Sequence, residues 1–190
     1  SNWSALRHVK NQTDEICMEA VNQSGYAIQY VRKPTFAIFM AAIKKDYDVI
    51  RIINADKNRK FLTTSEYNEL CMEVIKHNGY MLKDVIGQTR EICLAAVNEV
   101  GYSLTYVEKQ TPEICIAAVK RHGGALQCVK NQTFEICLAA VKQLGSAIQY
   151  VSKEIEVTPE YDDLCIEAIK QNKDAKRYIS EDVLRRLNIP

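Results

Sequence analysis

Apolar residues recur along the chain in short blocks that are separated by polar residues and glycine. The blocks QTREICLAAV (88–97), QTPEICIAAV (110–119) and QTFEICLAAV (132–141) are nearly identical, and QTDEICMEAV (12–21) differs little from them. The Ile-Cys pair and the Ala-Val pair of each block are three to four positions apart, so they share one face of an α-helix. The pattern predicts a helix of about eleven residues in each block.

The blocks belong to a tandem repeat in which one position, most often a cysteine, marks each unit. The marking residues are Cys17, Phe39, Cys71, Cys93, Cys115, Cys137 and Cys165. Four of the six intervals between them are 22 residues long, and the other two are 32 and 28 residues. We place the extra residues in insertions near 54–63 and 152–157, and we expect these insertions to be surface loops.

Polar residues and glycines define where each predicted helix starts and stops. The expected N-caps are threonines four residues before the marking position, and seven residues before it in the two lengthened units: Thr13, Thr35, Thr89, Thr111, Thr133, Thr64 and Thr158. Glycines eight residues after that position are expected to end the helix in the left-handed conformation: Gly25, Gly79, Gly101, Gly123 and Gly145. The six residues that follow fit a short α or 3₁₀ helix.

Neither helix of a unit can bury its apolar face alone, so like units must stack. The sequence therefore predicts an all-α fold, an α-solenoid of about seven 22-residue units. Each unit consists of a long helix, a glycine turn and a short α or 3₁₀ helix. We expect one helical-repeat domain over 3–179 and a C-terminal capping helix over 180–190 that starts at Ser180. Ser1 and Asn2 are interpreted as the remnant of a cleaved tag.

Residues 88–151 carry the repeat most regularly, in QTREICLAAV, QTPEICIAAV and QTFEICLAAVKQLGSAIQYV. With these residues the chain resembles a bacterial and giant-virus domain of unknown function whose repeats run roughly QTPEICLAAVKQNGYALQYV. The looser resemblance covers residues 3–179, with departures at Phe39, at Tyr47 in place of glycine and in the insertions. The resemblance implies a helical-repeat fold and no established activity. Because members include proteins of amoeba-associated intracellular bacteria, it also implies an intracellular or host-directed interaction role.

Composition agrees with a helical chain and argues against several classes of partner. Only 7 glycines and 4 prolines interrupt the 190 residues. The 25 Lys and Arg residues nearly balance the 24 Asp and Glu residues, so no global positive field attracts nucleic acid. No apolar run reaches the length of a membrane span, so we expect no membrane insertion.

The seven cysteines favour a reducing intracellular compartment, the cytoplasm or a host cytosol, because the count is odd and no signal peptide is recognisable. The repeated cysteines should be buried core thiols without chemistry, too far apart to form disulfides. No Cys-x-x-Cys pair or zinc spacing occurs, and we expect no metal and no cofactor. Cys128 replaces a tyrosine of the other units and is the thiol to test for reactivity.

Lysines five residues after the marking position, with two basic neighbours, form the candidate partner-binding surface: Lys44, Lys45, Lys76, Lys120, Arg121, Lys142 and Lys170. If the units stack with little twist, these residues form a basic column along one edge. Acidic residues occupy the first turn of the same helices, including Glu113 and Glu135. Because the helix dipole favours this distribution in any exposed helix, an ordinary solvated face is the alternative interpretation.

The sequence therefore predicts a non-catalytic helical-repeat scaffold that binds a protein or peptide. No glycine-rich phosphate loop and no nucleophile elbow occurs, so we expect no enzyme and no catalytic residues. One alternative is a repeat array that binds single-stranded nucleic acid, which the neutral net charge disfavours. Another is a non-catalytic region of a larger multidomain protein, such as a host-directed effector. The pattern leaves the oligomeric state open.

Overall fold

The computed structural model describes residues 3–189, and for residues 56 and 57 it describes the backbone alone. The interpreted tag remnant, Ser1 and Asn2, lies outside the described residues. The long helices are α1 (Asp14–Gln23), α2 (Phe36–Lys45), α5 (Thr64–His77), α6 (Arg90–Glu99), α7 (Pro112–Arg121), α8 (Phe134–Gln143) and α10 (Tyr161–Gln171). They correspond one to one with the predicted repeats.

A 3₁₀ helix follows each long helix, and one precedes the first. These are η1 (Trp3–His8), η2 (Gly25–Tyr30), η3 (Tyr47–Val49), η4 (Gly79–Asp84), η5 (Gly101–Tyr106), η6 (Gly123–Cys128), η7 (Gly145–Tyr150) and η8 (Lys173–Tyr178). Four short α-helices complete the chain: α3 (Ile50–Ile53), α4 (Asp56–Arg59), α9 (Lys153–Glu156) and α11 (Glu181–Arg186). The part of the chain that the structure describes contains no β-strand. The predicted all-α repeat fold is confirmed.

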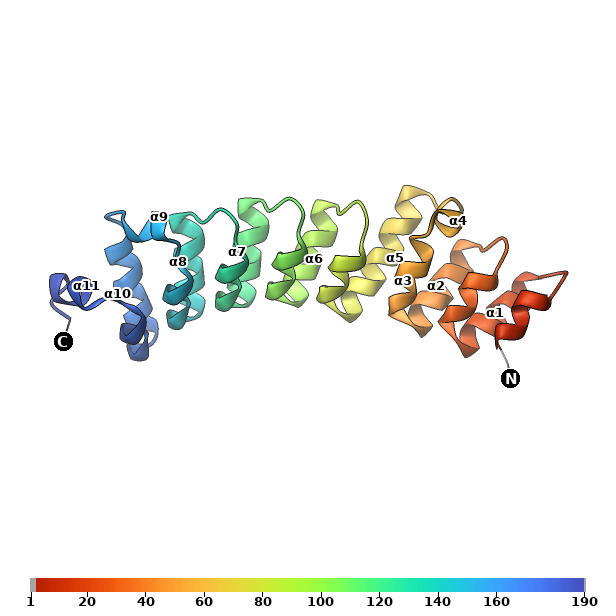
Figure 1. Ribbon diagram of the computed structural model, residues 1–190, viewed down its shortest axis with the longest axis horizontal. Coiled ribbons are helices and arrows are strands. Elements are labelled where there is room, and N and C mark those ends of the chain that lie inside the picture. Colours follow the sequence, from red (N-terminus) through yellow and green to blue (C-terminus); the bar gives the residue numbers. More distant parts are fainter. Residues whose placement is uncertain (1–2, 190) are drawn as a thin grey trace. The chain divides into compact units, whose positions relative to one another are not determined.

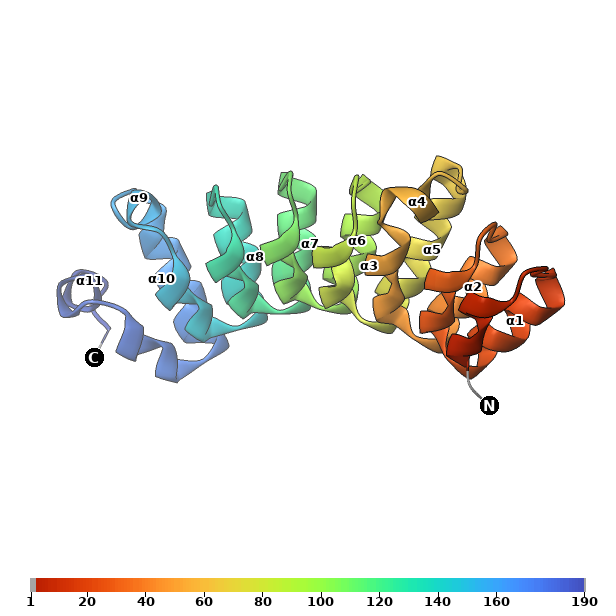
Figure 2. The ribbon, with the colours of Figure 1, turned by 45° about the vertical axis from the view of Figure 1, so that its right-hand side comes forward.

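The chain forms two compact units, Ser1–Ile92 and Cys93–Pro190, and their boundary falls within α6. In the N-terminal unit, α1, α2 and α5 pack side by side, with η1, η2 and η3 as a second layer (Figure 1). In the C-terminal unit, α7, α8 and α10 pack in the same manner against η5, η6, η7 and η8 (Figure 2). The expectation of a single domain over 3–179 stays a prediction.

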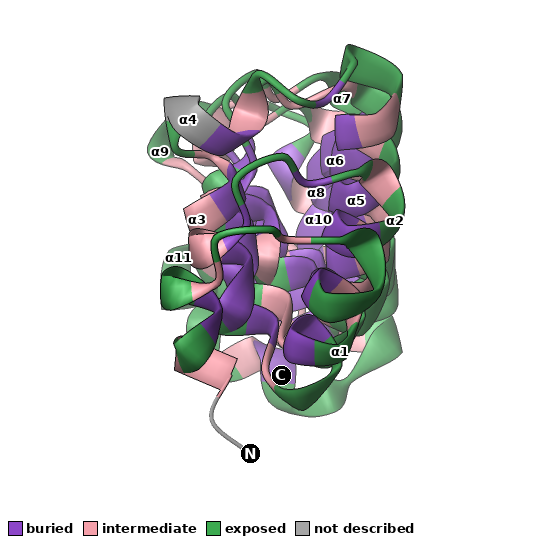
Figure 3. Cartoon of the chain, turned by 90° about the vertical axis from the view of Figure 1, so that its right-hand side faces the viewer, coloured by how far each residue is buried: buried purple, intermediate pink, exposed green. Residues whose placement is uncertain are grey.

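The core of each unit lies between the long helices and the 3₁₀ helices (Figure 3). In α7 the predicted apolar face is buried, with Ile114 and Cys115 at most 3% exposed and Ala118 and Val119 fully buried. The 3₁₀ helix η6 adds Ala125 and Leu126 to this core, both fully buried. The pattern of buried positions recurs in α8 and η7. Within each unit, burial of the apolar face of one repeat against the next therefore supplies the main stabilisation of the stack.

Threonine is found at the predicted N-cap in five repeats, and the prediction is wrong for the two lengthened helices. The side-chain oxygens of Thr13, Thr89, Thr111 and Thr133 accept a hydrogen bond from the backbone N–H three residues later. Thr35 has the extended backbone of an N-cap, but its side chain makes no capping hydrogen bond. Pro112 begins α7, as its fixed backbone angle allows.

The two lengthened helices begin differently from the prediction. Thr63, not Thr64, caps α5: its side-chain oxygen accepts from the Glu66 N–H, and its own N–H donates to the Glu66 carboxylate, which completes a capping box. At α10 the N-cap is Glu160, and the Thr158 hydroxyl donates instead to the Ile155 carbonyl. At α5 either of two adjacent threonines could serve as the N-cap, and at α10 the threonine belongs to a turn before the helix. Sequence spacing alone does not distinguish these arrangements from the predicted caps.

The five repeat glycines do not end their helices in the left-handed conformation, so that prediction is wrong. In these five repeats one extended residue separates the last helical residue from the glycine, and the glycine begins the 3₁₀ helix; His122 before Gly123 is one example, with φ −144° and ψ 108°. A Cβ on Gly101 would lie 2.5 Å from the Ala118 carbonyl oxygen of the next helix. Glycine is needed here because two backbones approach closely. Among the described glycines, Gly87 has a positive φ, of 68°.

A hydrogen bond across the repeat boundary uses the space that the missing side chain leaves. The N–H groups of Gly123 and Gly145 each donate to the side-chain oxygen of a glutamine at the end of the next long helix, Gln143 and Gln171, at 2.6 Å. Gly101 donates to Nδ1 of His122 at 3.1 Å. The close approach therefore links each 3₁₀ helix to the following long helix.

The glutamine of the QT motif links successive repeats, a role that sequence reasoning missed. The amide nitrogen of Gln132 donates to the Leu126 carbonyl of the preceding repeat and to the Tyr150 carbonyl of its own, at 3.4 and 2.8 Å. Its amide oxygen accepts from the Ser152 N–H at 2.8 Å. Gln12 and Gln110 make the same three bonds in their repeats. We call this arrangement the glutamine clamp.

The insertion near 54–63 replaces the clamp with two other residues. Asn54 donates its amide to the Asp84 carbonyl at 2.7 Å and accepts from the Tyr67 hydroxyl at 2.6 Å. The same hydroxyl accepts from the Ile86 N–H at 3.1 Å. Tyr67 stands where other repeats have the capping threonine, so Asn54 and Tyr67 together satisfy two of the three backbone groups that one glutamine satisfies elsewhere.

The expectation that both insertions are surface loops is wrong, because each contains a helical turn. α4 lies in the first insertion and α9 in the second. Near the C-terminus, the Ser180 hydroxyl accepts from the Val183 N–H and so caps α11, as expected. Arg186 of α11 forms an ion pair with Asp162 of α10, which holds the last helix against the repeat before it.

Candidate partner-binding surfaces

The predicted basic residues lie at the C-terminal ends of the long helices, on side chains that face away from the core. In the C-terminal unit, Lys120, Lys142 and Lys170 occupy the same position in α7, α8 and α10. All three are exposed, and because these helices are neighbours, the three side chains form one row, which we call the basic row. In the N-terminal unit, Lys44 and Lys45 end α2 and are likewise exposed.

Few of these cations are neutralised by neighbouring carboxylates. The Lys76 ammonium of the N-terminal unit lies 3.9 Å from Glu73, and that of Lys170 lies 3.8 Å from Glu167. Both lysine side chains remain about 70% exposed, at 70% and 68%, so these pairs contribute little. Arg121 donates from Nε to the Asn98 carbonyl at 2.8 Å, so its guanidinium is held at the end of the preceding helix.

The acidic first turns lie at the opposite ends of the same helices. Glu113, Glu135 and Asp163 are exposed in α7, α8 and α10. At the equivalent position in the N-terminal unit, hydrogen bonds from the Glu15 backbone N–H and from the Thr13 hydroxyl lower the pKa of the Glu15 carboxyl. The opposed charges therefore agree with stabilisation of each helix dipole, which was the alternative interpretation.

The structure assigns the predicted column to two separate groups. Three of the seven residues, Lys44, Lys45 and Lys76, belong to the N-terminal unit, and the other four to the C-terminal unit. A continuous column through all seven stays a prediction.

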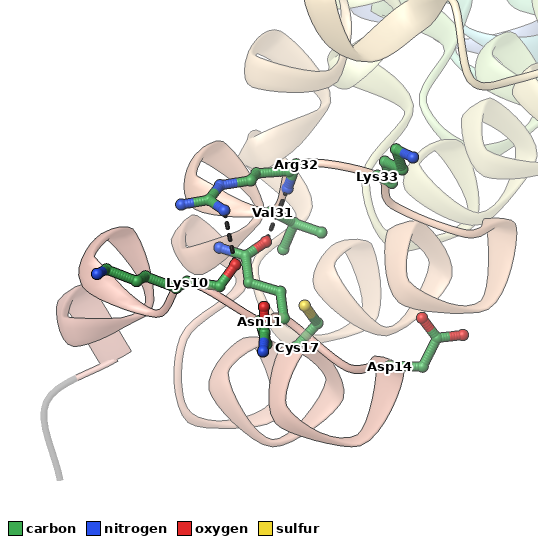
Figure 4. Close-up of a pocket in the computed structure, with 8 residues that line it drawn as sticks. Lys10, Asn11, Asp14, Cys17, Val31, Arg32 and Lys33 are labelled. Carbon is green, nitrogen blue, oxygen red and sulfur yellow. Dashed lines mark hydrogen bonds between the residues drawn. The ribbon is translucent and has the colours of Figure 1, made fainter.

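A crevice of 340 Å³ opens between the first two inter-repeat loops (Figure 4). Its lining comes from the loop before α1, from α1 itself and from the loop before α2: Lys10, Asn11, Gln12, Asp14, Cys17, Val31, Arg32 and Lys33. The glutamine clamp of Gln12 holds the two loops together, and the Arg32 guanidinium donates to the Lys10 carbonyl at 2.8 Å. Sequence reasoning missed these cations, although Lys or Arg directly after the valine of Val9 and Val31 was a visible signal.

The C-terminal unit has the equivalent crevice between the loops before α7 and α8. It measures 190 Å³ and is lined by Gln110, Thr111, Pro112, Cys115, Asn131, Thr133 and Ile136. The positions that match Lys10, Arg32 and Lys33 hold Glu108, Lys130 and Asn131. The two crevices therefore share one framework but differ in the charge around it.

The repeated cysteines are buried free thiols, as predicted. Burial raises the pKa of the Cys71, Cys137 and Cys165 thiols to about 11. The Cys137 thiol also contacts the clamp, 3.4 Å from the Gln132 amide oxygen. Cys128 is half-buried and accepts from the Thr105 hydroxyl at 3.0 Å.

The histidines make separate local contacts. His77 stacks on Tyr47 with ring centroids 3.6 Å apart, and Nδ1 of His122 accepts from Gly101. Over residues 3–189, no group of three or more His, Cys, Asp or Glu side chains is placed to hold a metal ion. In the same range, no helix combines the length and apolar character that crossing a membrane requires.

Comparison with known proteins agrees with the repeat pattern in the C-terminal unit. The family model described as Domain of unknown function (DUF4116) matches residues 111–156 and 133–184. The two overlapping matches are offset by 22 residues, the length of one repeat. No curated protein and no solved structure matches the chain. The resemblance to a domain of unknown function is therefore supported over residues 111–184.

Proposed function

We propose that the chain is a non-catalytic helical-repeat scaffold that binds an acidic segment of a partner protein. The observation that carries the proposal is the basic row: Lys120, Lys142 and Lys170 at one exposed position of three adjacent helices. Cations held at regular intervals on rigid helices match carboxylates spaced along an extended segment. The repeat framework supplies the interval, and the exposed side chains supply the recognition.

Arg121 adds a second type of contact beside this row. Its Nε is bonded to the Asn98 carbonyl, which orders the guanidinium and leaves the N–H groups of its two terminal nitrogens for a ligand. A pre-ordered guanidinium binds a carboxylate through two parallel hydrogen bonds at a lower entropic cost than a free side chain. This favours a protein ligand with Asp or Glu side chains.

Glu113, Glu135 and Asp163 distinguish the proposed ligand from a nucleic acid. They lie on the same helices as the basic row and would repel a phosphate backbone that ran across the exposed face. A polypeptide with both acidic and basic residues accommodates both ends of these helices. Binding of RNA is therefore an outcome that the test must detect.

The test compares two triple variants with the same change in net charge. Lys120→Gln, Lys142→Gln and Lys170→Gln together remove the basic row; Lys109→Gln, Lys130→Gln and Lys173→Gln remove three other exposed lysines of the same unit. The probes are a fluorescent Glu-rich peptide and a mixed-sequence single-stranded RNA, titrated at physiological salt. We expect the first triple variant to bind the peptide about tenfold more weakly and the second to stay within about twofold.

Two results would contradict the proposal. One is equal weakening by both triple variants, which indicates general charge attraction. The other is tighter binding of RNA than of peptide together with a steep loss of affinity as salt rises, which indicates phosphate binding.

We infer that the scaffold acts in a reducing intracellular compartment. Its seven described cysteines are all free, and six of them are buried in the repeat core. Oxidation of buried core thiols adds polar atoms to a packed interior, so an oxidising compartment would destabilise the fold. Mass spectrometry of protein purified without added reductant tests this inference. Stable, specific disulfides in the native protein would contradict it.

A further inference from the structure

We propose that the crevice between the first two inter-repeat loops binds a phosphomonoester, either as free phosphate or on a phosphorylated side chain. The site lies in the N-terminal unit and shares no residue with the basic row. Its success or failure is therefore independent of the proposed function. It consists of two loop cations, a clamped loop pair and the space between the loops.

Two positively charged side chains lie on one side of the crevice. In Figure 4 the side chains of Lys10 and Arg32 extend to the same side of the crevice. Lys33 and Asp14, which have opposite charges, lie on the other side. No carboxylate among the lining residues accompanies Lys10 and Arg32, so two positive charges remain there. A phosphomonoester has a charge of about −1.5 to −2 near pH 7 and matches them better than a single carboxylate does.

The protein holds the Arg32 side chain in place before any ligand binds. The backbone N–H of Arg32 donates to the Gln12 amide oxygen at 2.9 Å, and its Nη1 donates to the Lys10 carbonyl at 2.8 Å. Gln12 in turn donates to the Tyr30 carbonyl at 2.9 Å. The remaining guanidinium N–H groups keep the planar geometry that binds two oxygens of one phosphate.

The equivalent crevice of the C-terminal unit differs from the first crevice in its charged residues and in its volume. There the same clamp, on Gln110, holds the Lys130 N–H at 2.9 Å. The place of Lys10 is taken by Glu108, the place of Arg32 by Lys130, and the volume is 190 Å³ in place of 340 Å³. The framework belongs to the fold, whereas the pair of cations and the larger volume are specific to the first crevice.

The α2 side of the first crevice lacks the acidic first turn that α7 and α8 have. The loop that carries Arg32 leads into α2, the first turn of which contains no Asp or Glu, and the Thr35 side chain makes no capping bond. In α7 and α8 that turn contains Glu113 and Glu135. The α2 side therefore adds no negative charge to the crevice, whereas the first turn of α1 on the other side carries Asp14 and Glu15.

The experiment follows the backbone amide signals of Lys10 and Arg32 by NMR in the full chain. The probes are inorganic phosphate, a short phosphoserine peptide and the same peptide with unmodified serine. We expect both phosphate-bearing probes to shift these signals and saturate, and the unmodified peptide to leave them unchanged. If inorganic phosphate binds and the phosphopeptide does not, the proposed site is supported and its ligand is free phosphate.

Arg32→Gln is the decisive variant, and Lys33→Gln in the same loop is its charge-matched control. We expect Arg32→Gln to weaken phosphate binding about tenfold or more and Lys33→Gln to change it less than about twofold, since Lys33 lies on the Asp14 side. Lys10→Gln, which keeps the backbone carbonyl that orders Arg32, should weaken binding to an intermediate extent. Equal weakening by Arg32→Gln and Lys33→Gln, or equal binding of the unmodified peptide, would overturn the proposal.

Discussion

The N-terminal and C-terminal units build the same kind of repeat boundary in different ways. In the C-terminal unit, Gln110 and Gln132 form regular clamps, and the glycines that begin η5, η6 and η7 allow close backbone approach. In the N-terminal unit, Tyr47 replaces one such glycine, and Asn54 with Tyr67 replaces one clamp. The difference shows that the fold requires satisfied backbone groups at the boundary, not a particular residue that satisfies them.

The substituted clamp of the N-terminal unit has an ion pair beside it. Arg51 makes two hydrogen bonds, at 2.9 and 3.0 Å, to the Asp84 carboxylate beside the substituted clamp. This bidentate pair raises the pKa of the Arg51 guanidinium, through its hydrogen bond to Asp84 above all. In the regular repeats the position of Arg51 holds polar uncharged residues such as Thr105 and Gln127, which cannot form an ion pair. The irregular boundary thus recruits side chains that the regular one does not need.

The largest expected effect comes from closing the backbone approach in the regular unit. In Gly101→Ala the added Cβ would meet the Ala118 carbonyl oxygen at 2.5 Å, so the two repeats must move apart. We expect a loss of about 3 kcal/mol or more in the free energy of unfolding. Gly87→Ala is the control, because its Cβ meets nothing within 4 Å and only the positive φ is strained. Its expected loss is about 1 kcal/mol, and urea denaturation of both variants measures the difference. Equal losses would contradict the close-approach role.

The next largest effect tests whether the two kinds of clamp are equivalent. Tyr67→Phe leaves the Ile86 N–H and the Asn54 amide oxygen without their partner, and Gln132→Met does the same to the Ser152 N–H. Each variant should lose about 1–3 kcal/mol. Hydrogen exchange should accelerate at the Ile86 amide in the first variant and at the Ser152 amide in the second. Unchanged exchange at either amide would show that the corresponding clamp does not hold its boundary.

Alkaline pH should destabilise both units, because their buried thiols resist ionisation. The pKa of Cys71 and Cys137 is raised by burial to about 11, above the value of about 8.5 for an unfolded thiol. The stabilisation from a neutral buried thiol is therefore fully present below about pH 8.5 and is lost as pH rises through about 11.

The N-terminal unit has a further buried group of this kind, since burial raises the pKa of the Tyr67 hydroxyl to about 12. Urea denaturation at about pH 8 and about pH 10 measures the effect, and Cys137→Ala should lose less free energy between the two than the natural chain. An identical loss in both proteins would show that Cys137 does not contribute to the pH dependence.

The smallest expected effect is a gain in stability in the C-terminal unit. Ser103 is fully buried, and its hydroxyl has no hydrogen-bond partner among the described residues. The equivalent positions in the next two repeats are Ala125 and Ala147, both fully buried. Ser103→Ala should therefore raise the free energy of unfolding by about 1 kcal/mol. A lower melting temperature in this variant would contradict the assignment of Ser103 as an unsatisfied buried group.

Much of the fold could be predicted from the sequence because the repeat determines it many times over. The Ile-Cys and Ala-Val positions of α7 and α8 predict the buried face correctly, since only one helical face contains all four. The role of the glycines was misjudged, because a glycine after a helix has the same spacing whether it adopts positive φ or allows close contact. The caps at Thr63 and Glu160 were also misplaced, because neighbouring residues compete for the same N–H groups.

One of the two candidate surfaces could be located from the sequence, and the other could not. Sequence spacing was sufficient to locate Lys120, Lys142 and Lys170, because equivalent positions of a repeat share one exposure. It did not reveal the crevice between Lys10 and Arg32, since those residues lie 22 positions apart and meet only when two loops are clamped together.

The amino-acid sequence by itself determined the repeat length, the helical class and the buried face, because these depend on local periodicity and on burial that recurs in each repeat. Only the tertiary structure decided how one repeat is joined to the next. Those joints depend on hydrogen bonds between residues about 20 positions apart, such as Gln132 with Ser152 and Gly123 with Gln143, and on distances between two backbones. No local pattern contains that information, because it arises when two repeats pack.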